Sequence, residues 1–231
     1  MIDPKKLLDG LLGTQMPGGE GTVGDKAGQL GQLAKDNPIA TGAIAAVLLG
    51  TGTGRKLTGS AIKLGGLAAV AGLAYKAYQN YQSGKAPEAA REDGDLLPPP
   101  SDTTFHPAQA PQGEDEFALD LVRAMIAAAR ADGHIDAAER ERIAGRLNQA
   151  GMDAEAEAWL VAELEKPVDL DAIIDSAKTD AQKIELYTAS RLAIEPNSRA
   201  ERGYLDMLAG RLRLPDPLVD HIEATVAEAS A

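Results

Sequence analysis

The spacing of apolar residues over the last 118 positions of the chain decides its fold class. From Glu114 onward these residues recur every three or four positions, as in Phe117, Leu121 and Met125, and this places them on one face of a helix. No stretch alternates between apolar and polar residues as a half-buried strand does. The pattern predicts an all-α protein in which residues 114–231 form a helical bundle large enough for its own core.

Helix starts are marked by capping boxes, in which a side-chain acceptor is followed three residues later by Glu or Gln. The pairs that qualify are Asp136 with Glu139, Thr179 with Gln182, and Ser198 with Glu201. Asp216 is also predicted to be an N-cap, because Pro217 suits the first helical position. Together these signals predict helices over residues 115–131, 136–150, 154–165, 169–176, 180–194, 199–213 and 217–229.

Residues 1–85 differ in character, because they hold 17 of the 24 glycines and nine basic against five acidic side chains. The segment Ile39–Gly54 is sixteen residues long without a charge, and small residues four apart make a groove along one helix face. The pattern predicts a glycine-rich helical hairpin over about residues 39–78. Because glycine in a helix costs about 0.5–1 kcal/mol relative to alanine, we expect these positions to make close contacts.

Two interpretations of this hairpin remain open. In the first, it enters a membrane or its interface, where small residues let helices approach closely and tyrosines form an interfacial belt. The tyrosines are Tyr75, Tyr78 and Tyr81. A spanning helix needs about 20 apolar residues, so both arms are borderline in length. In the second interpretation, the hairpin is a soluble, glycine-packed helical pair or a self-association element.

Residues 86–113 contain six of the 13 prolines and few large apolar side chains. Such a composition buries too little surface to offset the entropy of ordering, so the sequence predicts an extended, mobile linker. The predicted organisation is therefore a glycine-rich region at 1–85, a flexible linker at 86–113 and a helical domain at 114–231.

Charge and composition exclude several classes of function. Residues 114–231 carry 25 acidic against 13 basic side chains, which would repel the phosphates of a nucleic acid. With no cysteine, the chain forms no disulfide, thiolate nucleophile, iron–sulfur cluster or cysteine-type zinc site. The glycine-rich segment before Lys56 is not a phosphate loop, because Leu57 follows that lysine where Ser or Thr is needed.

The turn between the first two helices of the bundle contains Asp132, Asp136 and Glu139. These residues match the later half of an EF-hand calcium loop. The first position of that loop is an alanine and the third is Arg130, so a complete EF-hand is excluded.

A second turn with acidic and amide side chains precedes the helix predicted at 199–213. If the two turns meet, their oxygen atoms suit a hard divalent cation, Ca²⁺ or Mg²⁺. The predicted ligands are Asp132, Asp136, Glu139, Glu195, Asn197 and Glu201. In the alternative interpretation, the same residues only cap helices, with Asp136 and Glu139 at one start and Ser198 and Glu201 at another.

Four segments carry a resemblance to known families. AMIAAARADGHIDAAERERI (residues 124–143) and SRLAIEPNSRAERGYLDMLAGRL (190–212) resemble the TerB-like helical domains associated with tellurite resistance. LLDGLLG (7–13) and KLGGLAAVAGLAYKAYQNYQ (63–82) are similar to the bacterial inner-membrane family typified by YebE, itself described mainly as a domain of unknown function.

The resemblance implies a TerB-like fold, attachment to the bacterial inner membrane with the C-terminal domain in the cytoplasm, and an acidic cluster that binds a divalent metal. Asp132, Asp136, Glu139 and Glu201 occupy the matching acidic positions. Glu195 and Asn197 depart from the family pattern, since aspartates are usual there. A role in tellurite resistance is not carried over, because a fold does not determine a function.

No motif indicates an enzyme, since His106, His134 and His221 lack ligand or triad spacing and no Gly-x-Ser-x-Gly occurs. The sequence predicts a non-enzymatic, membrane-associated protein that binds a divalent cation and acts in envelope or metal stress. The alternative is a soluble or peripheral interaction or self-association module with no metal. Predicted partners are a membrane and, through the hairpin, another protein or a second copy, but no nucleic acid.

Overall fold

The structure, a computed structural model, describes residues 2–12, 64–84, 86–87, 96–131, 154–194, 196 and 198–229. In this part of the chain there are eight α-helices, one short 3-10 helix and no strand, so the prediction of an all-α protein is confirmed. The elements are α1 (Pro4–Leu12), α4 (Gly66–Gln82), η3 (Pro107–Gln109), α5 (Glu114–Ala129), α7 (Ala154–Glu165), α8 (Leu170–Ser176), α9 (Asp180–Ala193), α10 (Arg199–Leu212) and α11 (Asp216–Ala229).

The helices from α5 onward begin and end within about two residues of the predicted positions, which is the usual uncertainty of helix ends. The predicted helix over 136–150 lies outside the described residues. Thr179 caps α9 by accepting a hydrogen bond from the Gln182 amide at 3.1 Å. The Gln182 side chain accepts instead from the Lys178 amide, so only one half of that capping box forms. Asp216 lies inside the first turn of α11, so the predicted N-cap is one residue too late.

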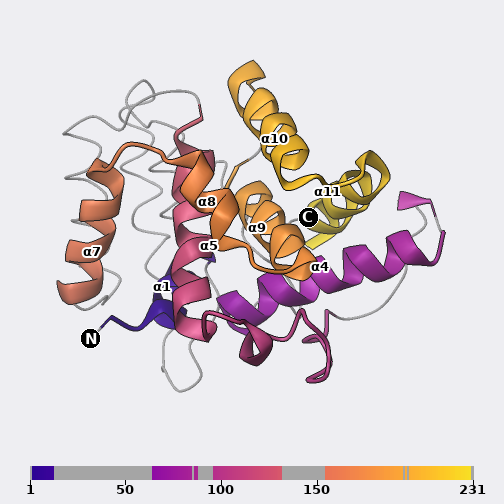
Figure 1. Ribbon diagram of the computed structural model, residues 1–231, viewed down its shortest axis with the longest axis horizontal. Helices are drawn as coiled ribbons and strands as arrows, with labels where there is room; N and C mark the ends of the chain where they lie inside the picture. The colour runs from indigo at the N-terminus through magenta and orange to yellow at the C-terminus, as the bar shows by residue number, and fades with distance from the viewer. Residues whose placement is uncertain are drawn as a thin grey trace, which may run out of the picture.

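Helix α9 lies at the centre of the described helices and packs against α5, α4, α10 and α11 (Figure 1). Twelve of its fourteen residues are buried, from Ala181 to Ala193. A helix buried around its whole circumference needs cover on every side, and α4 supplies part of that cover. One continuous apolar core therefore includes side chains from α1, α4, α5, α9 and α11.

Helix α4 belongs to this core, which corrects the predicted separation of residues 1–85 from the helical domain. It packs against α11, α9 and α1, and Val70, Leu73 and Ala74 are almost completely buried. Its glycines make close contacts with protein backbone: a Cβ at Gly66 would lie 2.7 Å from the Leu8 carbonyl carbon. The apolar face that suggested lipid is thus covered by other helices of the same chain, at least from Gly66 onward.

The predicted interfacial tyrosines also contact protein. Tyr75 and Tyr78 of α4 lie against Phe105, with ring centroids 5.5 and 5.4 Å apart, and Phe105 is only 5% exposed. No helix in the described residues combines the length and the hydropathy needed to cross a bilayer. The first arm of the predicted hairpin, including Ile39–Gly54, lies outside those residues.

Residues 96–113 are not an extended linker, so this part of the linker prediction is wrong. Phe105 fills the space beside α4, and the Gln112 side chain donates to the Ser176 carbonyl oxygen at 3.0 Å. Gln182 of α9 donates to the Gln112 side-chain oxygen, also at 3.0 Å. A few side chains thus hold this proline-rich segment against three helices, α4, α8 and α9.

Helix α1 docks on α4 and α5 through four buried leucines. The side chain of Asp9 accepts a hydrogen bond from the Gly66 amide at the start of α4, whose own N-cap is a glycine at φ +78°. A carboxylate from one helix thereby caps another, since Gly65 has no side chain to do so. The segments LLDGLLG and KLGGLAAVAGLAYKAYQNYQ, which carried one resemblance, meet at this contact.

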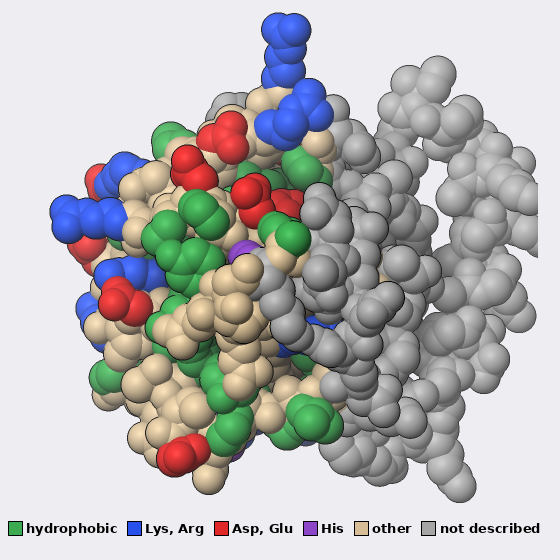
Figure 2. All heavy atoms as spheres, turned by 90° about the vertical axis from the view of Figure 1, so that its right-hand side faces the viewer, with side chains coloured by type: hydrophobic (Ala, Val, Ile, Leu, Met, Phe, Trp, Pro, Cys, Tyr) green, Lys and Arg blue, Asp and Glu red, His purple; other side chains and the backbone are tan. Residues whose placement is uncertain are grey.

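The surface of the described helices mixes charges. On the face in Figure 2, acidic and basic side chains are interspersed and apolar side chains lie between them. The acidic excess of the chain therefore does not form one continuous patch on the described part of that face.

Candidate functional site

Five of the six predicted metal ligands lie outside the described residues: Asp132, Asp136, Glu139, Glu195 and Asn197. The sixth, Glu201, is 8% exposed and forms a capping box at the start of α10. Its carboxylate accepts from the Ser198 amide at 2.8 Å, while the Ser198 hydroxyl accepts from the Glu201 amide at 3.1 Å. The capping interpretation is confirmed for this pair, and the metal site stays a prediction.

Among the described residues no group of three or more histidine, aspartate or glutamate side chains could hold a metal ion. His106 caps η3, where its Nδ1 accepts from the Ala108 amide at 3.2 Å. His221 is buried in α11, and its ring and that of Tyr81 form a T-shaped pair. His134 lies outside the described part of the chain.

A different site emerges between α5, the end of α7 and α8. A cavity of about 280 Å³ opens there, with an apolar part and a charged rim. The apolar lining is Ile126, Ala127, Pro167, Val168, Ala172 and Ile173, and the charged lining is Asp120, Arg123, Arg130, Glu163, Lys166 and Asp169. Its α5 residues recur three, four and seven apart, so one face of that helix forms the wall of the cavity.

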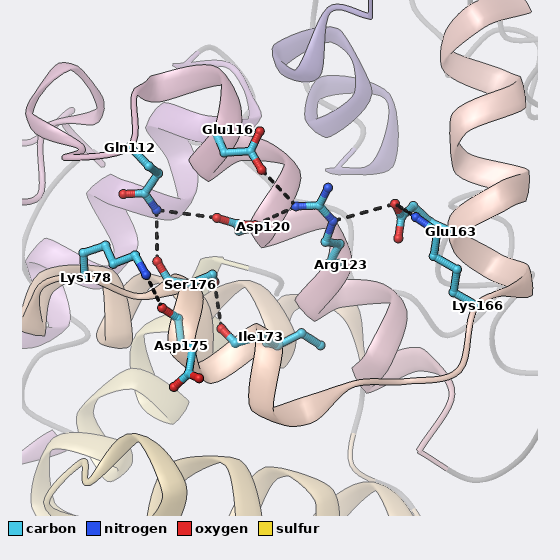
Figure 3. Close-up of polar contacts among 10 residues, drawn as sticks. All are labelled: Gln112, Glu116, Asp120, Arg123, Glu163, Lys166, Ile173, Asp175, Ser176 and Lys178. Carbon is cyan, nitrogen blue, oxygen red and sulfur yellow. Dashed lines mark hydrogen bonds and ion pairs between the residues drawn. The ribbon is translucent and has the colours of Figure 1, made fainter.

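Arg123 organises the charged rim (Figure 3). Its Nη1 donates to Asp120 at 2.7 Å and to Glu116 at 3.3 Å, and its Nε lies 3.8 Å from Glu163. The guanidinium also lies 5.6 Å from the centre of the Trp159 ring on α7, which is a cation–π contact. One arginine on α5 thus holds α7 in place by charge and by stacking.

Asp120 is 7% exposed and links the rim to the segment before α5. Burial raises the pKa of its carboxyl group above the ordinary value, and this outweighs the hydrogen bonds from Arg123 and Gln112, which lower the pKa. The side-chain amide of Gln112 lies 3.5 Å from the Asp120 carboxylate. The same group donates a shorter hydrogen bond, of 3.0 Å, to the Ser176 carbonyl oxygen at the end of α8. The wall of the cavity is therefore held by partners on three elements, as Figure 3 shows.

The other two cations of the rim differ in their partners. The Lys166 amine lies 2.7 Å from Glu163, which is 8% exposed. Arg130, at the end of α5, donates from Nη1 to the Lys166 carbonyl oxygen at 2.6 Å, and no carboxylate of the described residues pairs with it. Its Nε is buried without a hydrogen-bond partner in that part of the chain.

The comparisons with known proteins identify the family. Residues 34–226 match the family described as "Protein of unknown function (DUF533)", which is most of the chain. The chain belongs to the DUF533 family. This DUF533 chain is also similar to an uncharacterized protein encoded in the ampR 5′ region of Yersinia enterocolitica, with 29% identity over 114 residues, 49% of this chain and 82% of that protein. No solved structure matches.

Neither comparison names a TerB-like domain or a YebE-like protein, so that finer resemblance stays a hypothesis for this DUF533 chain. The sequence gives no direct sign of this cavity, because its walls come from α5, the turn after α7 and α8. Arg123 and Arg130 are seven residues apart, two helical turns, and this spacing was the available signal that both line one face of α5.

Proposed function

We propose that this DUF533 protein is a non-enzymatic interaction module attached to a membrane through residues 39–63. The observation that supports this proposal is the position of α4: its apolar face is occupied by α9, α11 and α1. The sixteen uncharged residues Ile39–Gly54 are then the segment of the predicted hairpin left for lipid. Because they are fewer than the roughly 20 residues of a spanning helix, the proposed mode is insertion into the interface.

The hydrogen bonds and ion pairs among the rim residues support a binding role over a catalytic one. Arg123 is shared among three carboxylates, and the Glu163 carboxylate accepts from Lys166. Asp169 caps α8 by accepting from the Ala172 amide at 2.9 Å. A general acid or base must be free to transfer a proton to or from the reacting atom. The rim carboxylates are instead engaged with cations or backbone amides, and this suits a binding surface.

Membrane fractionation tests the attachment. We expect the full chain to stay with membranes through washes with high salt and carbonate, and the variant Leu48→Glu/Leu49→Glu to be released. Leu97→Glu is the matched control, because Leu97 is 70% exposed on the helical body and should not affect attachment. Helical circular dichroism of each variant confirms that the body is intact. Complete release of the unmodified chain by either wash would contradict the proposal.

We propose the module without a bound metal, because the carboxylate of Glu201, one of the predicted ligands, already caps α10. Calcium and magnesium titration of the full chain, followed by thermal scanning, separates the two forms. We expect the melting temperature to be independent of either ion. An ion-dependent rise that is lost in Asp132→Ala would instead support the acidic-turn site. The location at the inner membrane is proposed from the resemblance alone. The same holds for envelope or metal stress as the physiological context.

A further inference from the structure

The cavity between α5, α7 and α8 joins an apolar lining to a cation that lacks a counter-ion among the described residues. Arg123 and Lys166 are each paired with carboxylates at 3.8 Å or less. Arg130 has one hydrogen bond, to a carbonyl oxygen, and no ion pair within the same part of the chain. A guanidinium has five N–H donors, and apart from the buried Nε–H and the one bonded to Lys166, three on the two Nη atoms are left for a ligand.

We propose that this cavity binds a small monocarboxylate with a short aliphatic body. The carboxylate pairs with the Arg130 guanidinium, which matches two parallel acceptors. The aliphatic body lies against Ile126, Ala127 and Ile173. Both parts are needed, because an exposed ion pair alone contributes little and an apolar contact alone gives no orientation.

The size and charge of the site select this class of ligand. A volume of about 280 Å³ is at the lower limit of ordinary ligand pockets, so it suits a molecule smaller than a nucleotide or a drug. The rim holds three cations and three carboxylates, with no net charge. A dianionic phosphate would meet Asp120, Glu163 and Asp169 as well as the cations, whereas one negative charge needs only the Arg130 cation.

The inference is independent of membrane attachment, since every residue that carries it belongs to the described helices and the turn between α7 and α8. Titration of the full, isotope-labelled chain with hexanoate, followed by amide chemical shifts, tests it. Hexanamide has the same body without the charge, and inorganic phosphate has charge without the body. We expect saturable shifts at the end of α5 and in α8 with hexanoate, and binding at least about tenfold weaker with hexanamide or phosphate.

Three variants locate the interaction. Arg130→Gln should reduce hexanoate binding about tenfold, to the level of hexanamide. Ala172→Phe should block both organic probes by filling the cavity, and Ala172 is exposed, so the larger side chain does not strain the core. Arg199→Gln, at an exposed position on α10, is the matched control and should leave all three affinities unchanged.

Several results would overturn the inference. They are equal affinity for hexanoate and hexanamide, full discrimination between them in Arg130→Gln, shifts that map away from α5 and α8, or shifts that do not saturate. Should Arg130→Gln fail to fold, Ala172→Phe decides: hexanoate binding that survives in this variant excludes the cavity.

Discussion

Helices α4 and α7 differ in how far they belong to the apolar core, and the difference is the reverse of what their sequences suggest. Helix α4 comes from the glycine-rich region predicted to lie outside the helical domain, yet it packs against α1, α9 and α11 in the shared core. Helix α7 comes from the middle of the predicted domain, yet among the described elements its main contact is with α5, and Figure 1 shows it apart from α9, α10 and α11. An apolar helix face thus indicates that something covers it, without identifying the cover.

The difference extends to single residues. Trp159 of α7, although large and apolar, is only partly buried and lies beside Arg123. Leu73 of α4, which belongs to the predicted hairpin, is 2% exposed. Four experiments test how much α4, its contact with α1 and the central helix α9 contribute to stability, one of them by direct comparison with α7.

The most severe test removes α1 and α4 together. The fragment 114–231 should lose cooperative unfolding, because the faces of α5, α9 and α11 that α1 and α4 cover become exposed to water. Thermal unfolding followed by circular dichroism measures this. Supplying residues 1–113 as a separate chain should restore a cooperative transition. A fragment that melts as sharply and at the same temperature as the full chain would show that residues 114–231 fold independently of residues 1–85, as the sequence predicted.

Truncation of one side chain on each helix compares them directly. Leu73→Ala should lower the free energy of unfolding by about 2–5 kcal/mol, as expected for a fully buried leucine. Trp159→Leu keeps an apolar side chain and loses mainly the contact with Arg123, so we expect about 1 kcal/mol or less. Urea denaturation at equilibrium provides both values. The reverse order would show that α7 contributes more than its contacts suggest.

The contact between α1 and α4 is tested by adding a methyl group. Gly66→Ala places a Cβ 2.7 Å from the carbonyl carbon and 2.8 Å from the oxygen of Leu8, so the helices must separate, at a cost of about 1–3 kcal/mol. Gly210→Ala in α10 is the matched control, since nothing lies within 4 Å of its added Cβ. We expect that control to stabilise the protein by about 0.5–1 kcal/mol. A neutral or stabilising Gly66→Ala would mean that α1 is not closely docked.

The central helix supplies a test by pH. Glu185 of α9 is 2% exposed, and burial raises the pKa of its carboxyl group well above the ordinary value of 4.5. The folded protein therefore binds this proton more tightly than the unfolded chain, and stability falls as pH rises through the folded pKa. Glu185→Gln should be more stable than the unmodified chain above that pKa, and the difference should shrink as pH falls towards 4.5.

Denaturation curves measured at several pH values check this expectation. Asp206→Asn, at an exposed position on α10, controls for the loss of a carboxylate at the surface. A difference between Glu185→Gln and the unmodified chain that does not change with pH would show that folding does not raise the pKa of the Glu185 carboxyl group.

The sequence alone determined the local structure of this protein. Apolar spacing and short-range hydrogen bonds set the bounds of α7, the N-cap at Thr179 and the capping box at Ser198 and Glu201, because all partners lie within four residues of one another. Such interactions need no knowledge of the rest of the fold. The same locality explains why the three-residue spacing of Ser198 and Glu201 was enough to predict that they cap a helix.

Which surfaces meet depends instead on contacts between residues far apart in the chain. The Gly66 amide is capped by Asp9, 57 residues away, and Gln112 bonds Ser176 across 64 residues. The cavity beside Arg130 exists because α8 and the turn after α7 come to the same face of α5. Pairing over such separations depends on shape and on competition among many apolar faces, and a periodic pattern records only that each face is apolar.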